Sequence, residues 1–210
     1  MTAEAVIQAW DRADPEAIHP LRRVSEDAYW DSGRAQADML ATVIPTGAKV
    51  MDFGCGDGRV AIPMAALGYD VTAVDSSQNM LDRLTETIDD ITTTHADLTL
   101  GITAVRAAAD GIAAHLGRRR MDAVYCLAVL IHHSYEDGLH IIERLRAATK
   151  LGGILVLDWP ISETPSEADS WIGVTTWSRK QQTAACARIG LEPVDSELPW
   201  GVYRAVKVGA

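Results

Sequence analysis

A short glycine-rich segment places the tightest constraint on how this chain can fold. Residues 50–59 read Val-Met-Asp-Phe-Gly-Cys-Gly-Asp-Gly-Arg, an apolar run that breaks into three alternating glycines. Consecutive apolar residues are typical of a strand that is buried on both faces of a parallel sheet. Glycine permits a tight turn and the close approach of a ligand, because it has no Cβ. A helix beginning near Arg59 would direct unpaired N–H groups and its positive dipole end towards a polar or negatively charged ligand.

The spacing of these glycines differs from that of the dinucleotide-binding fingerprint. That fingerprint is G-x-G-x-x-G, and it places a pyrophosphate at a helix N-terminus. Here the order is G-x-G-x-G, and Arg59 stands where the third glycine of the fingerprint would be. A nicotinamide dehydrogenase is therefore disfavoured. A second apolar run, residues 69–74, ends at Asp75, whose carboxylate could accept hydrogen bonds from both hydroxyls of a ribose.

Residues 50–59 and 71–75 together resemble the motifs of the class I S-adenosylmethionine-dependent methyltransferases. Further resemblances follow in the same order along the chain, at residues 108–111, 121–133 and 145–157. The resemblance covers roughly residues 48–208. It implies an α/β fold: a single doubly wound, seven-stranded sheet of the Rossmann-like methyltransferase type, with its last strand antiparallel and helices ahead of the core.

The hydrophobic pattern agrees with alternating strands and helices, which predict a parallel sheet with helices on both faces. Strands are expected at 48–53, 70–74, 102–107, 121–127 and 153–158, and helices at 58–67, 77–89, 110–116 and 136–148. A further helix is expected at 178–189, capped by Ser178 and ended by Gly190, before an antiparallel pair of strands at 191–196 and 201–208. Between residues 88 and 100, either the helix continues or a loop is inserted.

The domain organisation expected is an N-terminal helical cap segment, residues 1–45, followed by a methyltransferase core domain, residues 46–210. The cap segment is expected to contain helices at 3–13 and 31–44, the second ended by Pro45-Thr-Gly47. With 210 residues, 48% of them hydrophobic, the chain is long enough for one sizeable core.

Composition limits the compartment and the partners. No apolar stretch of roughly 18 residues is present, and the N-terminus lacks the pattern of a signal peptide, so neither a membrane span nor secretion is expected. Cys55, Cys126 and Cys186 form no C-x-x-C pair, which argues against a disulfide framework and a metal site and favours a cytoplasmic location. The net charge of −10 argues against a nucleic-acid-binding surface. The oligomeric state is left open.

The resemblance assigns roles to residues that would bind S-adenosyl-L-methionine and its product S-adenosyl-L-homocysteine. Backbone groups around Gly54 and Gly56 would take the amino-acid end, and Asp75 the ribose hydroxyls. Asp110 would accept from the adenine amine; the alternative is that it caps the helix that follows it. The expected cofactor-binding set in the core is Gly54, Cys55, Gly56, Gly58, Asp75, Ser76, Met80, Asp110, Gly111 and Leu127. Asp57 is expected to cap the helix after the glycine turn.

The segment Tyr29–Arg34 is a second candidate for the cofactor pocket. In the family that this chain resembles, helices ahead of the core often cover the cofactor, and an aromatic face attracts a sulfonium through a cation–π interaction. The four candidates are Tyr29, Trp30, Ser32 and Gly33. The alternative is that the two aromatic residues only anchor the N-terminal helices to the core, and the sequence leaves both interpretations open.

Two histidines, His132 and His133, follow the predicted fourth strand, where ligands bind in sheets of this kind. A histidine can remove a proton from a nucleophile near neutral pH, so both are candidate catalytic bases. Alternatively they are structural, and methyl transfer often needs no base, because alignment of the nucleophile with the electrophilic methyl group supplies much of the rate. Trp159, Trp171 and Trp177 could stack on a planar acceptor or could serve only in packing.

The function expected is methyl transfer from S-adenosylmethionine to an oxygen or nitrogen of a small-molecule acceptor. Two alternatives remain: a methyltransferase-fold module that binds the cofactor without turnover, and methylation of a macromolecule, either protein or nucleic acid. The sequence does not identify the acceptor.

Overall fold

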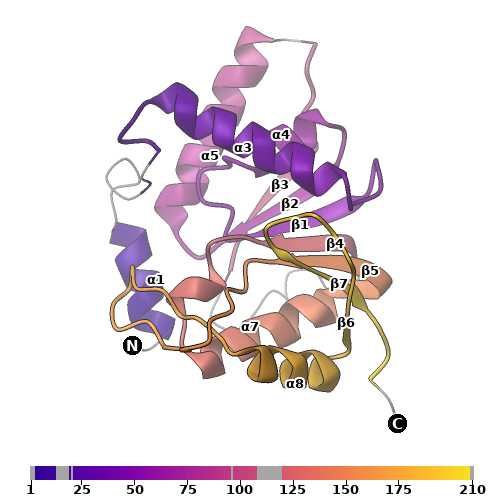
Figure 1. Ribbon diagram of the computed structural model, residues 1–210. Helices are drawn as coiled ribbons and strands as arrows, with labels where there is room; N and C mark the ends of the chain where they lie inside the picture. Colours follow the sequence, from indigo (N-terminus) through magenta and orange to yellow (C-terminus); the bar gives the residue numbers. More distant parts are fainter. Residues whose placement is uncertain (1–2, 13–18, 20, 96, 108–119, 209–210) are drawn as a thin grey trace. The chain divides into compact units, whose positions relative to one another are not determined.

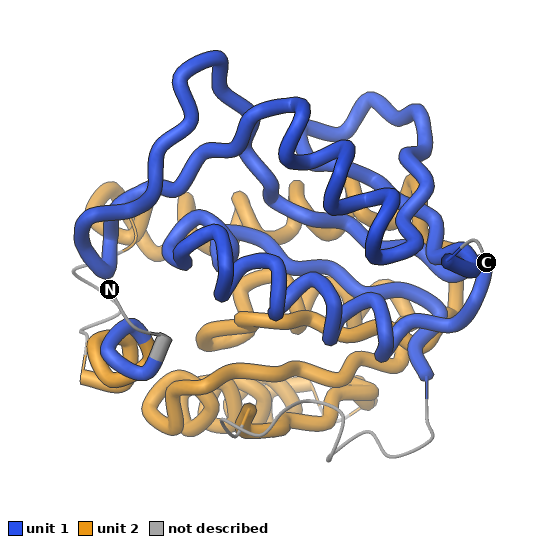
Figure 2. The backbone as a smooth tube through the Cα atoms, turned by 90° about the horizontal axis from the view of Figure 1, so that it is seen from below, with its two compact units in different colours: residues 1–6, 108–210 blue, residues 7–107 orange. Residues whose placement is uncertain are grey.

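The computed structural model describes residues 3–12, 19, 21–95, 97–107 and 120–208. The chain divides into two compact units, one formed by residues 7–107 and the other by residues 1–6 and 108–210 (Figure 2). Seven strands form one sheet in the order β3-β2-β1-β4-β5-β7-β6, in which β7 is antiparallel to both β5 and β6. This is the seven-stranded, doubly wound arrangement that the sequence predicts.

In the unit of residues 7–107, three parallel strands alternate with helices (Figure 1). The strands are β1 (Lys49–Phe53), β2 (Asp70–Asp75) and β3 (Ile102–Arg106), and β2 pairs with both of the others. The helices are α3 (Glu26–Ala41), α4 (Ala61–Ala66) and α5 (Gln78–Thr94), with the end of α1 (Ala3–Arg12). Helices α4 and α5 both contact β2 and β3, and α3 packs on α4.

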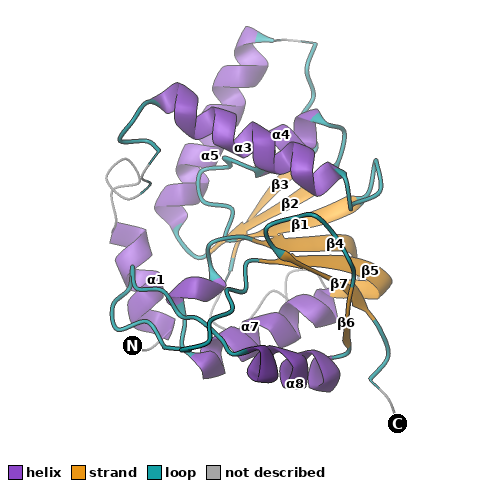
Figure 3. Ribbon diagram, in the orientation of Figure 1, coloured by secondary structure: helices purple, strands orange, loops and turns teal. Residues whose placement is uncertain are grey.

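In the other unit, β4 (Met121–Cys126) pairs in parallel with β5 (Thr149–Leu157), and β7 (Gly201–Ala205) lies between β5 and β6 (Leu191–Pro193). Helix α7 (Tyr135–Ala148) packs on β4 and β5, and α8 (Arg179–Ile189) packs on α7 and β6 (Figure 3). The short helix η1 (Leu130–His132) connects β4 to α7. No helix in the described part of the chain is long and apolar enough to cross a membrane.

Several element boundaries differ from the sequence-based prediction, and each has a local cause. Helix α3 begins at Glu26 rather than residue 31, because Ser25 caps it by accepting a hydrogen bond from the Ala28 amide and two acidic residues occupy its first turn. Helix α5 continues to Thr94, so the long link before β3 is partly helix. Strand β5 begins at Thr149 and contains a register shift near Gly152, which has a positive φ of 79°.

The C-terminal helix follows the prediction closely, whereas the two strands after it end earlier than predicted, at Pro193 and Ala205. Ser178 caps α8 through a reciprocal capping box with Gln181, and Gly190 ends the helix with a left-handed φ of 81°. The expected helix at 110–116 lies outside the described residues. The segment between β5 and α8 contains no helix and is held instead by two isolated β-bridges, Ile161 with Trp177 and Ser166 with Thr176.

Gly33 allows α3 to approach the glycine turn closely. A Cβ at this position would lie 2.0 Å from the carbonyl oxygen of Arg59, far inside van der Waals contact. We expect Gly33→Ala to destabilise the protein by about 1–3 kcal/mol, because backbone on both sides must move apart. Chemical denaturation would measure the change, with Arg34→Ala as the control on the exposed face of the same helix. Equal stability of Gly33→Ala and the wild type would contradict this packing.

Candidate functional site

Three glycines with positive φ form the turn after β1. Gly54, Gly56 and Gly58 have φ values of 80°, 55° and 93°, which residues other than glycine rarely adopt. The amides of Gly54 and Cys55 both donate to the carbonyl oxygen of Val74, at 2.8 and 3.1 Å, so the turn is tied to the end of β2. A Cβ at Gly56 would have no neighbour within 4 Å, whereas one at Gly58 would lie 2.3 Å from Leu84. Gly58 therefore serves packing, and the turn is open beside Gly56.

The carboxylate of Asp75 is held in a fixed orientation at the end of β2. One oxygen accepts a hydrogen bond from the amide of Gly56 and the other from the amide of Ser77, both at 2.8 Å. Burial raises the pKa of Asp75 above its ordinary value, and the backbone amides of Ser77, Gly56 and Ser76 oppose that shift. Each carboxylate oxygen can accept more than one hydrogen bond, so Asp75 keeps acceptor capacity for two hydroxyls.

The start of α5 places two more predicted residues next to Asp75. Ser77 is fully buried and caps α5 by accepting a hydrogen bond from the amide of Met80 at 3.3 Å. The Met80 side chain is buried at this helix start. The carbonyl oxygen of Ser76 accepts a hydrogen bond from Nε of Arg106 at 3.2 Å, which links it to the end of β3. Asp75, Ser76 and Met80 are thus gathered where β2 passes into α5.

A buried polar cluster connects the N-terminal helices to the glycine turn. The hydroxyl of Tyr29 donates to one oxygen of Asp57 at 2.5 Å, and the guanidinium of Arg22 pairs with the other oxygen at 2.7 Å. Arg22 also stacks over the Tyr29 ring, 4.1 Å from its centroid. The prediction that Asp57 caps the next helix is therefore wrong. The cap residue of that helix is Val60, which makes no side-chain hydrogen bond.

The remaining candidates on α3 lie beside this cluster. Ser32 donates to the carbonyl oxygen of Tyr29 at 2.6 Å and accepts a hydrogen bond from Arg59 at 3.0 Å. The rings of Tyr29 and Trp30 meet edge to face, with centroids 5.3 Å apart. Tyr29, through Asp57, and Ser32, through Arg59, therefore anchor α3 to the glycine turn and the residue after it, whereas Trp30 contacts its neighbour Tyr29 on the same helix.

In the unit containing β4 and β5, the two histidines are fixed by the loop that precedes α8. Nδ1–H of His132 donates to the carbonyl oxygen of Gly173 at 3.0 Å, because a carbonyl can only accept. In the neutral ring, Nε2 is then the nitrogen that carries a lone pair. Burial lowers the pKa of His132, while the Gly173 carbonyl and the Asp158 carboxylate act in the opposite direction. Burial also lowers the pKa of His133, whose carbonyl oxygen accepts from the Thr175 hydroxyl.

The carboxyl ends of β4 and β5 are joined beside these histidines. The amide of Ala128 donates to Asp158 at 3.2 Å, and Ala128 has a φ of 56°, the one positive value among the described non-glycine residues. A non-glycine residue in this region is strained and is frequently found near functional sites. Leu127 precedes it and is half-buried.

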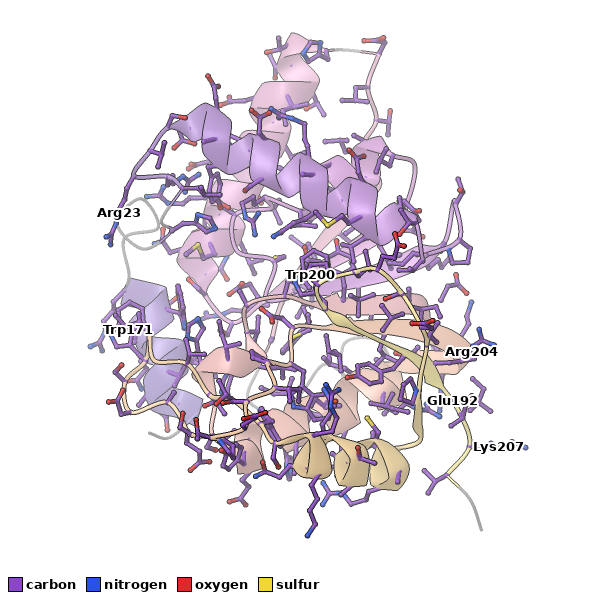
Figure 4. All side chains as sticks on the ribbon, viewed as in Figure 1. Arg23, Trp171, Glu192, Trp200, Arg204 and Lys207 are labelled. Atoms are coloured by element: carbon purple, nitrogen blue, oxygen red, sulfur yellow. The ribbon has the colours of Figure 1, made fainter. Side chains whose placement is uncertain are left out.

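Two of the tryptophans are packing residues. Trp177 and Trp159 are only 2% and 4% exposed. Their rings meet edge to face at 5.4 Å, and Trp177 also contacts Tyr135 at 4.8 Å. Neither is therefore placed to stack on an acceptor in this arrangement. Trp171 lies on the loop before α8, away from β5 (Figure 4).

The sequence did not predict that four further residues take part in this site. Arg22, Arg59 and His19 surround Tyr29, and Ser77 holds the start of α5. Ser77 carried a usable signal, since a serine before a helix is a common N-cap. Arg22 and His19 carried none, because only the folded chain brings them to Asp57 and Tyr29. Asp110 and Gly111 lie outside the described residues.

Known proteins share both the sequence motifs and the fold. Residues 50–153 match the family model described as methyltransferase domain. A ubiquinone biosynthesis O-methyltransferase from Paraburkholderia phymatum is 26% identical over 91% of this chain and 75% of its own length. One from a Caulobacter species is 31% identical, and there this chain spans only 52% of the relative's length. Magnesium protoporphyrin IX methyltransferase from Synechocystis, solved with bound S-adenosylmethionine, superposes with a TM-score of 0.61 at 19% identity, over 98% of this chain and 92% of that one.

The strand order, with β7 antiparallel, is that of the Rossmann-like methyltransferase fold. With these matches, the chain belongs to the class I S-adenosylmethionine-dependent methyltransferases. It is a methyltransferase whose cofactor is S-adenosylmethionine.

The hydrogen bond from Tyr29 to Asp57 should contribute more to stability than a neutral one, because its acceptor is a carboxylate. We expect Tyr29→Phe to lower the free energy of unfolding by about 1.5–3 kcal/mol. The matched comparison is Tyr69→Phe, which removes a buried hydroxyl that donates to the carbonyl of Ile44 at 3.0 Å. Its loss should cost about 0.5–1.5 kcal/mol. Urea denaturation of both variants tests this order, and the reverse order would refute it.

Proposed function

We propose that this protein transfers a methyl group from S-adenosylmethionine to an oxygen or nitrogen of a small-molecule acceptor. The observation that carries the proposal is the carboxylate of Asp75, fixed by the amides of Gly56 and Ser77 beside an open glycine turn. An oriented, half-buried carboxylate suits a pair of ribose hydroxyls, and the space beside Gly56 suits the close approach of the cofactor.

The proposed cofactor contacts follow from these positions. Backbone groups of the glycine turn bind the amino-acid end, Asp75 the ribose, and Ser76 and Met80 the edges of the adenine. The segment of residues 1–45 acts as a helical cap, and its residues on α3 cover the cofactor in addition to anchoring that helix. The proposed set is Tyr29, Trp30, Ser32, Gly33, Gly54, Cys55, Gly56, Gly58, Asp75, Ser76, Met80, Asp110, Gly111 and Leu127. The bound sulfonium supplies an activated methyl group.

The proposed catalytic base is His132, and His133 is the alternative. The Gly173 carbonyl fixes the ring so that Nδ1 carries the proton, which assigns proton acceptance to Nε2. Burial lowers the pKa of this imidazole below its ordinary value of about 6.5, which favours the neutral form at pH 7. A neutral, oriented imidazole can take a proton from a hydroxyl or ammonium group, and this leaves the acceptor oxygen or nitrogen with the lone pair that methyl transfer would need.

The relatives support an oxygen acceptor. The two curated relatives named above are O-methyltransferases of ubiquinone biosynthesis, and their identities of 26% and 31% favour small-molecule acceptors without identifying one for this chain. Binding of the cofactor without any turnover on phenols, catechols or amines would instead favour a module that only binds the cofactor, or an enzyme that methylates a macromolecule.

Asp75 provides the direct test of cofactor binding. We expect Asp75→Asn to weaken S-adenosylhomocysteine binding by at least tenfold, because hydrogen bonds to a charged acceptor contribute about 1.5–3 kcal/mol each. Titration calorimetry would measure the dissociation constant. Asp70→Asn is the control, since Asp70 begins the same strand, is exposed and pairs only at 3.7 Å with Lys49. Unchanged affinity in Asp75→Asn, or no binding by the wild type, would sink the proposed function.

His132 provides the test of the base. We expect His132→Asn to reduce kcat by about 10²-fold or more while cofactor affinity is retained, because asparagine can keep the donor to Gly173 but has no basic nitrogen. Labelled S-adenosylmethionine and a panel of phenols, catechols and primary amines would report the rate. The exposed His140 on α7 offers the control His140→Asn. A larger loss in His133→Asn than in His132→Asn would transfer the role to His133.

The pH dependence provides a second readout of the same base. Burial lowers the pKa of His132 below the ordinary histidine value of about 6.5. As the pH rises, the ring therefore becomes neutral at a lower pH than an ordinary histidine. The rate should be constant above this pH and should fall as the pH drops through the lowered pKa, because imidazolium cannot accept a proton. His132→Asn should remove this acid limb. An acid limb that persists in the variant would show that another group titrates.

A further inference from the structure

Hydrogen bonds anchor the loop between β5 and α8 to the segment that follows β4. Thr175 is fully buried; its amide donates to the carbonyl of Ile131 and its hydroxyl to the carbonyl of His133, both at 2.6 Å. A carboxylate oxygen of Glu167 accepts from the amide of Tyr135 at 2.6 Å, and the carbonyl of Thr176 accepts from the Tyr135 hydroxyl at 3.1 Å. The loop is therefore fixed on the segment that carries His132.

Two apolar side chains on this loop face solvent on either side of Gly173. Ile172 is 56% exposed and Val174 is 51% exposed. The carbonyl of Gly173 between them accepts the hydrogen bond from His132, so the exposed pair flanks the contact that orients the proposed base. Covering two exposed β-branched side chains with an apolar ligand is favourable, and ligand sites combine apolar side chains with a few placed polar groups, as Ile172 and Val174 do here with His132.

The charge of the same loop is entirely negative. Residues 160–177 contain Glu163, Glu167 and Asp169 and no lysine or arginine. Glu163 and Asp169 are exposed, and Asp158 just before the loop adds a further carboxylate. An anionic acceptor would therefore be repelled from this surface, whereas a neutral or cationic one would not.

We propose that the acceptor of this methyltransferase is an apolar, uncharged or cationic molecule whose apolar body lies on Ile172 and Val174 while its hydroxyl or amino group meets His132. This inference rests on the proposed function, because it takes His132 as the base of the reaction. Ile172 and Val174 select the acceptor by its apolar body, and the acidic loop selects against an anionic one. Thr175, next to Val174, is tied by two hydrogen bonds to the segment that carries His132, so this apolar pair is attached beside the proposed base.

A series of 4-alkylphenols tests the apolar contact directly. Equilibrium dialysis would give the dissociation constants of 4-ethyl-, 4-butyl- and 4-hexylphenol, with S-adenosylhomocysteine present. We expect affinity to rise by about three- to fourfold for each added methylene, as expected when a methylene leaves water. In the double variant Ile172→Ser with Val174→Ser this gain should fall below about 1.5-fold per methylene. Affinity that does not depend on chain length in the wild type would overturn the proposal.

A charge-matched pair of probes tests the second half of the proposal. We expect 4-(4-hydroxyphenyl)butanoate to bind at least about tenfold more weakly than 4-butylphenol, because its carboxylate meets the acidic loop. Glu163→Gln with Asp169→Asn should strengthen binding of the carboxylate probe by at least about twofold and leave 4-butylphenol unchanged. Tighter binding of the carboxylate probe than of 4-butylphenol by the wild type would overturn the assignment.

Controls separate this inference from the proposed function. Leu151→Ser removes a side chain of similar exposure, 54%, on β5, and should leave every dissociation constant unchanged. The dissociation constant of S-adenosylhomocysteine should be the same in all variants, because none lies in the proposed cofactor set. Failure of the wild type to bind S-adenosylhomocysteine contradicts the proposed function. In that case the phenol series, repeated without S-adenosylhomocysteine, still tests whether the apolar surface binds the alkyl chain. Cofactor binding without any chain-length or charge effect defeats the acceptor class alone.

Discussion

The hydrogen bonds between the glycine turn and the end of β2 fix the geometry on which the proposed cofactor site depends. The carbonyl of Val74 accepts from Gly54 and Cys55, and the carboxylate of Asp75 accepts from Gly56. These bonds need backbone dihedral angles that only glycine adopts readily, so the sequence requirement and the site geometry have one cause. They also orient Asp75 before any ligand arrives, which reduces the ordering cost of binding.

A buried charge would be costly at this position unless it were paired. Asp57 follows directly on Gly56 and is almost fully buried, and its two oxygens are satisfied by Tyr29 and Arg22. Removing either partner leaves a buried carboxylate with less compensation, which is usually destabilising. The pairing therefore ties the N-terminal helix α3 and the segment before it to the turn. This accounts for the close approach that Gly33 permits.

The loop before α8 shows how a segment without regular structure can be precise. Thr175 donates to two backbone carbonyls, the hydroxyl of Tyr135 donates to a third, and Glu167 accepts from the amide of Tyr135. These bonds satisfy backbone groups that would otherwise lack partners. The same bonds set the position of the Gly173 carbonyl, and that carbonyl decides which nitrogen of His132 carries the proton. This loop without a helix thus determines which nitrogen of the proposed base carries the proton.

The sequence by itself determined the strand and helix order, the glycine turn, the carboxylate after β2, and the cap and end of α8. These features depend on local rules: alternation of apolar runs, glycine's conformational freedom, and serine capping. Only the tertiary structure decided that Asp57 pairs with Arg22 and Tyr29, that Trp159 and Trp177 are core residues, and that Gly173 orients His132. The contacts of Asp57 and of His132 join residues far apart in the chain. Trp159 and Trp177 are nearer to each other and lie at the two ends of one loop. No local pattern encodes such a pairing, because its free energy comes from burial and hydrogen bonding that exist only after the chain has folded.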